Sequence, residues 1–462
     1  MDFMHIAAVV LVLAAAFSFL AQLAPRVPLK IGILLLSLAA FLVLLGLDRW
    51  TGADLAGWAS RLASSVDFSQ VVLEGFLGFL LFAGALEVEL ADLWDHRREV
   101  SILATLGVLV STFLVGGAVY ALARALGLGL DLVHALLFGA LISPTDPIAV
   151  MALFRSLGAP RALQTKVTGE SLFNDGIGVV VFLVILGLLT RPAEVTVSSV
   201  LLLLVVEVLG GVAFGLAAGL LAYLMLRRVD NYPVEVLITL ALVVGGYVLA
   251  GDLHVSAPIA MVVAGLFIGN RGRRLAMSEN TRLHLDHFWE MVDDLLNVVL
   301  FVLIGLEVLV IAFDHQRLWA GALAVPLVLL ARWLSVRLSL GLLGQGRANG
   351  PAVVRVLIWG GLRGGISVAL ALSLPADASR ELILTMTYVV VVFSIGAQGL
   401  TLPLLLPAAR RELGTGPAPP EPMPGEASAS ANAEGSALEP HPAPDPAPHP
   451  APDRASAPEP RP

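Results

Sequence analysis

The segment Ser143-Pro144-Thr145-Asp146-Pro147 lies within a long apolar run that covers residues 131–154. Prolines remove backbone donors and disfavour the helical conformation in the residues before them, so a helix through this run has to break here. A break in mid-membrane exposes amide and carbonyl groups, and it is tolerated only where it faces protein or water. A proline kink alone requires no aspartate, so Asp146 favours an ion-binding site.

The chain around this segment has the composition of a membrane protein. Of its 462 residues, 57% are hydrophobic and 14% are charged, and the mean hydropathy is +0.87. Soluble domains carry about 25% charged residues. Apolar runs recur near the ~20 residues that cross a bilayer as a helix. We therefore expect an all-α polytopic membrane protein with thirteen transmembrane helices, over 5–24, 30–47, 71–90, 100–126, 131–154, 167–189, 197–226, 232–250, 254–270, 286–312, 317–342, 351–374 and 381–408.

Basic residues predict the orientation of these helices. One alternating set of loops holds seventeen Lys and Arg residues and the other holds six. The positive-inside rule places the richer set in the cytoplasm, which puts the N-terminus outside and the C-terminus inside the cell (plasma or inner) membrane. The chain divides into a transmembrane domain, residues 1–413, and a tail, residues 414–462, whose Pro- and Ala-rich acidic composition predicts disorder.

A second interrupted helix is predicted in the twelfth span, at Gly360-Gly361-Leu362-Arg363-Gly364-Gly365. The two breaks lie seven spans apart, so spans 1–6 and 8–13 can form inverted repeats joined by span 7, as in alternating-access transporters. Where two interrupted helices cross, half-helix N-termini gather positive potential and C-termini gather negative potential. We expect Asp146 to compensate the positive potential of the half-helix N-termini and Arg363 the negative potential of the C-termini.

The sixth span opens with a polar helical face. Ser171, Asn174 and Asp175 are spaced three and four residues apart, so they share one side of a helix. Their hydroxyl, amide and carboxylate groups, together with carbonyls freed at the first break, offer oxygen ligands for a small cation. Glu170 points elsewhere, and we expect it to pair with Arg332. Five other charged residues lie near predicted span ends and are expected to extend to the interface: Glu74, Glu89, Glu235, Glu307 and Arg337.

In chain order, five motifs resemble those of the NhaP-type sodium/proton antiporters, relatives of the animal sodium/proton exchangers. They are SPTDP (143–147), GESLFND (169–175), FWEMVDDLLNVVLFVLIGLEV (288–308), ARWLSV (331–336) and GGLRGG (360–365). The resemblance spans about residues 5 to 410. It implies the antiporter fold and a secondary active exchange of Na⁺ for H⁺. The transported Na⁺ and H⁺ are the only ions implied, and no cofactor or enzymatic activity is expected.

The resemblance also implies roles for single residues. Asp175 would bind cation and proton in turn, with Ser171 and the Thr145 backbone carbonyl as Na⁺ ligands and Asp146 close by. Asn174 stands where electrogenic relatives carry a second aspartate, so the exchange would be electroneutral. The Glu170 and Arg332 pair would be structural.

Two further implications follow from the family. Some relatives use a glutamate of the third span; Glu87 fits this role best, although Glu89 leaves the choice open. The family also implies a homodimer, in which the domain with the breaks moves against a helical scaffold.

Burial in an apolar site favours the neutral form of a carboxylate, so protons and cations can compete for it. Oxygen ligands alone do not set the size of the cation, which leaves K⁺/H⁺ exchange open. Two remoter alternatives are a transporter-derived sensor and an intramembrane aspartyl protease that uses Asp146 and Asp175, although no Gly-x-Gly-Asp-like sequence is present.

A net charge of −8 argues against nucleic acid as a partner, and the absence of cysteine excludes thiol catalysis.

Overall fold

Helices make up all the regular secondary structure in the computed structural model, which describes residues 3–23, 27–51, 57, 67–147, 150–151, 154, 157–190, 197–275, 277–309, 314–343 and 350–413. Within these ranges no residue is assigned to a strand. The described residues belong to one compact unit, residues 1–416. The tail predicted to be disordered, residues 414–462, lies outside the described residues.

The helices follow the apolar runs. The continuous ones are α1 (Phe3–Gln22), α2 (Leu29–Thr51), α11 (Arg161–Thr190), α12 (Val197–Leu226), α13 (Tyr232–Asp252), α16 (Glu279–Glu307) and α17 (His315–Leu342). The third span is built from α4 (Phe68–Gln70), η1 (Val71–Phe76) and α5 (Leu77–Glu87), followed by α6 (Leu90–Asp95), and the fourth from α7 (Arg97–Ala104) and α8 (Leu106–Leu126). Later spans join α14 (Ala257–Phe267) to η3 (Ile268–Gly272) and α15 (Arg273–Leu275), and α20 (Ala378–Phe393) to η4 (Ser394–Gln398), α21 (Gly399–Thr401), η5 (Leu402–Leu404) and α22 (Leu406–Glu412).

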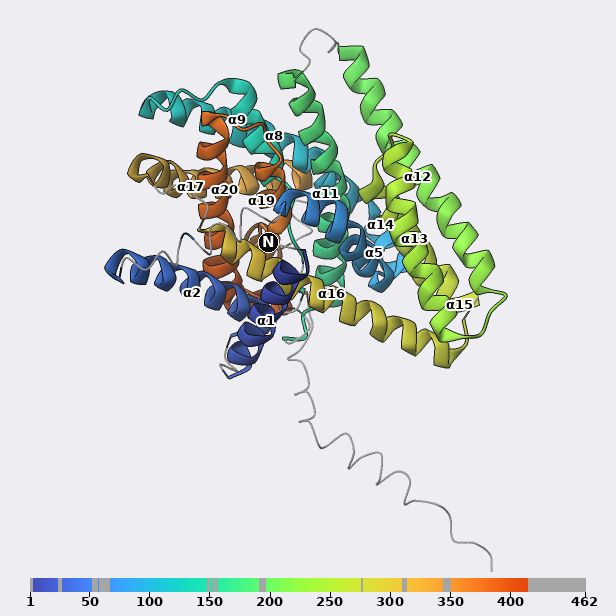
Figure 1. Cartoon of the computed structure of the whole chain (residues 1–462). Helices are drawn as coiled ribbons and strands as arrows, with labels where there is room; N and C mark the ends of the chain where they lie inside the picture. The colour runs from blue at the N-terminus through green and yellow to red at the C-terminus, as the bar shows by residue number, and fades with distance from the viewer. Residues whose placement is uncertain are drawn as a thin grey trace, which may run out of the picture. The chain divides into compact units, whose positions relative to one another are not determined.

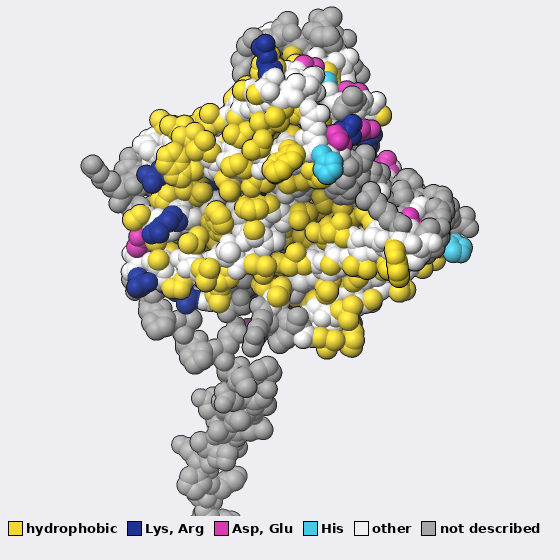
Figure 2. Space-filling view, turned by 90° about the vertical axis from the view of Figure 1, so that its left-hand side faces the viewer, with side chains coloured by type: hydrophobic (Ala, Val, Ile, Leu, Met, Phe, Trp, Pro, Cys, Tyr) yellow, Lys and Arg dark blue, Asp and Glu magenta, His cyan; other side chains and the backbone are white. Residues whose placement is uncertain are grey.

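The predicted all-α membrane fold is confirmed. Among the described residues, nine helices are long and apolar enough to cross a membrane, and two shorter apolar helices span Leu132–Ile142 and Ala257–Gly272. One face of the molecule presents an extended hydrophobic surface with charged side chains gathered toward its margins (Figure 2). Exposed leucines of α12, such as Leu202, Leu209 and Leu221, have the character of a helix face that meets lipid.

Two groups of helices have separate apolar cores. The larger core is formed by α1, α2, α8, α9 (Leu132–Ile142), α11, α16, α17, α18 (Pro351–Trp359), α19 (Gly365–Leu372) and α20, and the smaller by α5, α12, α13, α14 and α16. In Figure 1, α12, α13 and α14 lie on one side of α11, and α8, α9, α17 and α20 lie on the other. Small residues permit close packing within each group. A Cβ atom on Gly139 would overlap the Thr112 carbonyl, and one on Gly215 would overlap that of Ala260.

The expectation that charged residues near span ends extend to the interface is wrong for Glu235 and Glu307. Their exposed fractions are 0% and 6%, and among the described residues both carboxylate oxygens of Glu235 and Oε2 of Glu307 have no hydrogen-bond partner. Glu235 lies on the face of α13 that packs against α16, one turn before Thr239, whose hydroxyl accepts a bond from Trp289 of α16 (3.1 Å). Packing between helices covers these side chains despite their place near a span end. The other three residues expected there are exposed: Glu74, Glu89 and Arg337.

Candidate cation site

The two interrupted helices meet at their breaks. The first break follows α9 (Leu132–Ile142), and the second separates α18 (Pro351–Trp359) from α19 (Gly365–Leu372). The backbone N–H of Asp146 donates to the carbonyl of Leu362 at 2.8 Å. One backbone hydrogen bond therefore joins two non-helical segments that are more than 200 residues apart in sequence.

Opposite charges lie at opposite half-helix ends. The guanidinium of Arg363, which is 2% exposed, donates to the carbonyls of Ser143 and Pro144 just after the C-terminus of α9. The carboxylate of Asp146 lies against Gly364, the N-cap residue of α19, where a Cβ atom would overlap Oδ2 of the aspartate. A cation at a helix C-terminus and an anion at an N-terminus are the stabilising arrangement for the helix dipoles.

The polar face of α11 holds the first break in place. Oδ1 of Asn174 accepts from the Thr145 backbone N–H (3.2 Å), and its Nδ2 donates to Thr145 Oγ1 (2.8 Å). The same Oγ1 shares a hydrogen bond with Ser171 Oγ (3.0 Å). All three side chains are at most 2% exposed. Gly178 permits this approach, because a Cβ atom there would overlap Pro144.

Asp175 is buried beside these groups, with an exposed fraction of 4%, and it interacts electrostatically with Asp146 and Arg363. The next residue, Gly176, packs against Ile259 of α14, so an apolar helix covers this part of α11. In the described part of the chain, no three histidine, aspartate or glutamate side chains converge on a metal position. A cation bound here would depend on hydroxyl and backbone oxygens in addition to carboxylate.

Glu170 and Arg332 form a buried bidentate ion pair. Nη1 of Arg332 donates to Oε1 of Glu170, and Nη2 donates to Oε2 (3.0 Å). Arg332 is 6% exposed and Glu170 is 1% exposed. The same Nη2 also donates to the carbonyl of Leu357 in the last turn of α18 (2.9 Å). The pair therefore connects α11, α17 and α18. The sequence suggested the two partners but not the contact with α18.

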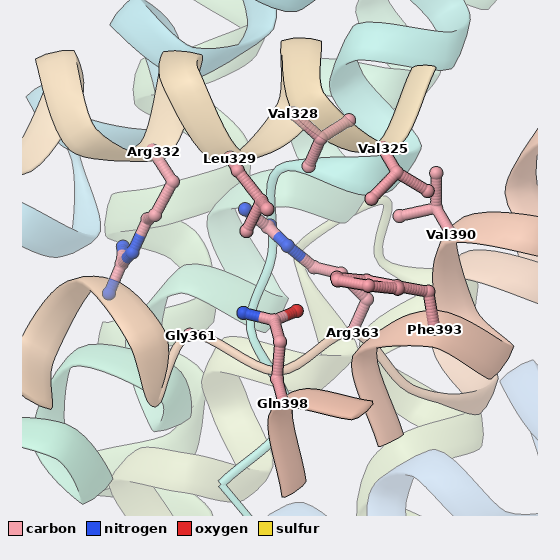
Figure 3. A pocket seen from close by; sticks show the side chains of 9 residues that line it. All are labelled: Val325, Val328, Leu329, Arg332, Gly361, Arg363, Val390, Phe393 and Gln398. Carbon is pink, nitrogen blue, oxygen red and sulfur yellow. The ribbon is translucent and has the colours of Figure 1, made fainter. Parts of the chain in front are cut away.

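A small cavity separates the two buried arginines. It is lined by Arg332 and residues of the same face of α17, by Gly361 and Arg363 from the second break, and by α20 and η4 (Figure 3). Gly361 leaves room for the first arginine, since a Cβ atom there would be 2.6 Å from Nε of Arg332. The second break therefore packs against the guanidinium of Arg332. The two arginines contact different half-helices, Arg332 the last turn of α18 and Arg363 the carbonyls that follow α9.

Glu87 is not among the buried groups. It is the last residue of α5 and is exposed, as is Glu89. Asn270 and Arg273, which the sequence analysis did not single out, hold the chain here. Asn270 donates to the Val88 carbonyl (2.9 Å) and accepts from the Leu90 N–H (2.7 Å), while Arg273 donates to the Leu86 carbonyl (2.9 Å). No sequence motif indicated these side chain to backbone contacts.

Comparisons with known proteins agree on one family. The family model described as "Sodium/hydrogen exchanger, transmembrane" matches residues 3–408. The Na(+)/H(+) antiporter NhaP of Pseudomonas aeruginosa is 48% identical over 381 residues, which cover 82% of this chain and 90% of that protein. The Na(+)/H(+) antiporter NhaH of Halobacillus aidingensis is 37% identical over 349 residues, which cover 74% of this chain and 84% of that protein.

The fold is shared with a solved structure. The sodium proton antiporter MjNhaP1 from Methanocaldococcus jannaschii at pH 8 matches with a TM-score of 0.69 and 22% sequence identity. The match covers 90% of this chain and 100% of that chain.

Proposed function

Because the chain belongs to the sodium/hydrogen exchanger family, we propose that it is a secondary active antiporter that exchanges Na⁺ for H⁺ across the cell membrane. Membership of this family makes the protein a transporter and not an enzyme. The observation that carries the proposal is the buried carboxylate of Asp175 beside two crossed helix breaks, next to the Thr145 and Ser171 hydroxyls. The intramembrane protease alternative has no comparable support.

In the proposed site, Na⁺ binds to the Asp175 carboxylate, Ser171 Oγ and the backbone carbonyl of Thr145. Asp146 lies close by, where it also compensates α19. Both ends of the Asn174 amide are bonded to Thr145, so Asn174 acts by positioning the break. Glu170 and Arg332 form a structural pair. A direct role for Glu87 has the weakest support, because this side chain is exposed.

Exchange follows from competition for one carboxylate. Asp175 is neutralised by Na⁺ or by a proton, and a bare charge at this depth opposes reorientation of the site because an isolated ion is poorly solvated there. Each cycle then trades one Na⁺ for one H⁺ without net charge movement. The inverted repeats, spans 1–6 and 8–13, would provide the two alternating states, with the N-terminus outside and the C-terminus in the cytoplasm.

The moving surface is proposed to be the contact between the two helix groups. An apolar cluster there joins α5 and α14 to α6, α7 and α11, and it contains Leu81, Leu172 and Val262. Apolar side chains can slide past one another without breaking hydrogen bonds. The helices around α12 would form the scaffold. They would also form the contact between two copies of the chain in a homodimer, as in the family.

Purified protein in liposomes with a trapped pH dye tests the proposal. Addition of Na⁺ is expected to move protons, with K⁺ and Li⁺ as comparison cations and the Asp175→Asn variant as the inactive control. A response to K⁺ that exceeds the response to Na⁺ would favour K⁺/H⁺ exchange on the same fold. The absence of any response to all three cations would contradict antiport and favour a sensor.

A further inference from the structure

The N-terminus of α18 is capped by a residue about sixty positions further along the chain. Oε1 of Glu412, at the end of α22, accepts from the Ala352 N–H (2.9 Å), and Oε2 accepts from the N–H groups of Ala352 (2.8 Å) and Val353 (3.0 Å). These are the second and third residues of α18, the positions whose N–H groups a capping side chain normally serves.

The sequence around the start of α18 leaves this task to Glu412. The N-cap residue is Gly350, which has no side chain, and the first helical residue is Pro351, which has no N–H. The first bond within the helix runs from the Val354 N–H to the Gly350 carbonyl (3.1 Å). Gly350 also makes room for the cap, because a Cβ atom there would overlap the Glu412 carboxylate.

The other end of α18 is held by the same part of the chain and by the buried ion pair. Gln398 of η4 donates to the Trp359 carbonyl (3.1 Å), and the Trp359 indole donates to Thr401 of α21 (2.9 Å). Arg332 donates to the Leu357 carbonyl. The half-helix thus has an anion at its N-terminus and a cation at its C-terminus, so its dipole is compensated at both ends.

A short path connects the cap to the candidate site. The nine residues of α18 span about 13 Å at 1.5 Å per residue. Immediately after them, Leu362 accepts from the Asp146 N–H, and Arg363 donates to the Pro144 carbonyl (2.8 Å). An axial shift of α18 would therefore displace the break that contacts Asp146 and Pro144.

We propose that Glu412 is a positioning residue for ion exchange. By capping α18, Glu412 sets the axial position of the half-helix and, through it, the geometry of the crossed breaks. The proposal rests on the exchange activity proposed above. The carboxylate acts only through the helix, because it lies at the opposite end of α18 from the break.

The test is exchange measured in liposomes over a range of Na⁺ concentrations. Glu412→Ala is expected to raise the apparent KM for Na⁺ roughly three- to tenfold, the range that loss of a helix cap implies. A cap that merely supports folding would instead lower Vmax at unchanged KM, through loss of folded protein. Arg411→Ala is the matched control, since this neighbour in α22 is exposed and its side chain donates to the Pro407 carbonyl of its own helix.

A rescue variant separates capping from any other effect of the carboxylate. Gly350→Asp in the Glu412→Ala background supplies an acidic N-cap locally, in the space that Glu412 has vacated, and it is expected to return the KM to within about twofold of the parent. An unchanged KM in Glu412→Ala, or a raised KM that the rescue variant leaves raised, would overturn the proposal. If the parent protein itself showed no Na⁺-driven proton movement, the proposed function would fail instead.

Discussion

Asn174 binds Thr145 at two points, through the backbone N–H (3.2 Å) and through the hydroxyl (2.8 Å). Both the oxygen and the nitrogen of one side-chain amide are thereby bonded to Thr145, the residue of the first break that precedes Asp146. This relationship places a non-helical chain segment on the polar face of α11, beside the buried carboxylate of Asp175.

Asn174→Ala removes both bonds to Thr145. The Thr145 N–H and hydroxyl then lose this partner, and each buried polar group left unsatisfied typically costs ~1–3 kcal/mol. We therefore expect exchange to fall at least about tenfold while the amount of folded protein is unchanged. Dye-based transport assays and size-exclusion chromatography in detergent measure the two quantities. Thr145→Ser, which keeps the hydroxyl, is the control and should remain close to the parent. Full activity of Asn174→Ala would refute the positioning role.

Asp175→Asn keeps the shape of the side chain but removes the charge and the titrating group. We expect it to abolish Na⁺-driven proton movement without loss of expression. Asp252→Asn, at the exposed end of α13, provides the matched control and should transport normally. Exchange near the parent level in Asp175→Asn would mean that another group carries the proton.

Glu170→Gln leaves Arg332 buried without its full counter-charge. Breaking a buried ion pair by removing one partner destabilises a protein by ~3–5 kcal/mol, so the thermal unfolding temperature in detergent should fall clearly. The exposed pair of Arg317 and Glu381 offers a comparison, because Glu381→Gln should change stability by only ~0–1 kcal/mol. Equal unfolding temperatures for Glu170→Gln and the parent would contradict the importance of the buried pair.

Electroneutral exchange predicts that membrane voltage has no effect on the final equilibrium. Moving one elementary charge across 100 mV is worth ~2.3 kcal/mol, but a cycle that trades one Na⁺ for one H⁺ moves no net charge. In vesicles with a potential clamped by valinomycin and K⁺, the reversal point should depend only on the Na⁺ and H⁺ gradients. A reversal point that moves with voltage would point to Glu87 or Asp146 as a second proton carrier.

Deletion of residues 414–462 should leave exchange essentially unchanged. The deletion retains Glu412 and therefore the cap on α18, and the removed segment has the composition of a disordered tail. Transport rates measured over a range of pH values for the parent and the deletion variant provide the test. A large shift of the pH profile would show that the tail regulates the transporter.

The sequence by itself determined the helices, their two interruptions and the chemical character of the site. Apolar run length predicts membrane helices, and the prolines around Thr145 and the glycines around Arg363 predict breaks from local backbone geometry alone. The helical spacing of Ser171, Asn174 and Asp175 likewise predicts a shared polar face. These inferences depend only on residues that are close together in the chain.

Other relationships were decided by the tertiary structure. The cap that Glu412 provides for α18, the second contact of Arg332 with Leu357, and the burial of Glu235 and Glu307 all depend on which helix faces meet. Partners separated by tens or hundreds of residues leave no periodic or compositional signal in one sequence, because hydrogen bonds and burial are set by distance in space. The local pattern therefore predicts what each helix presents, and only the packed helices decide what each side chain contacts.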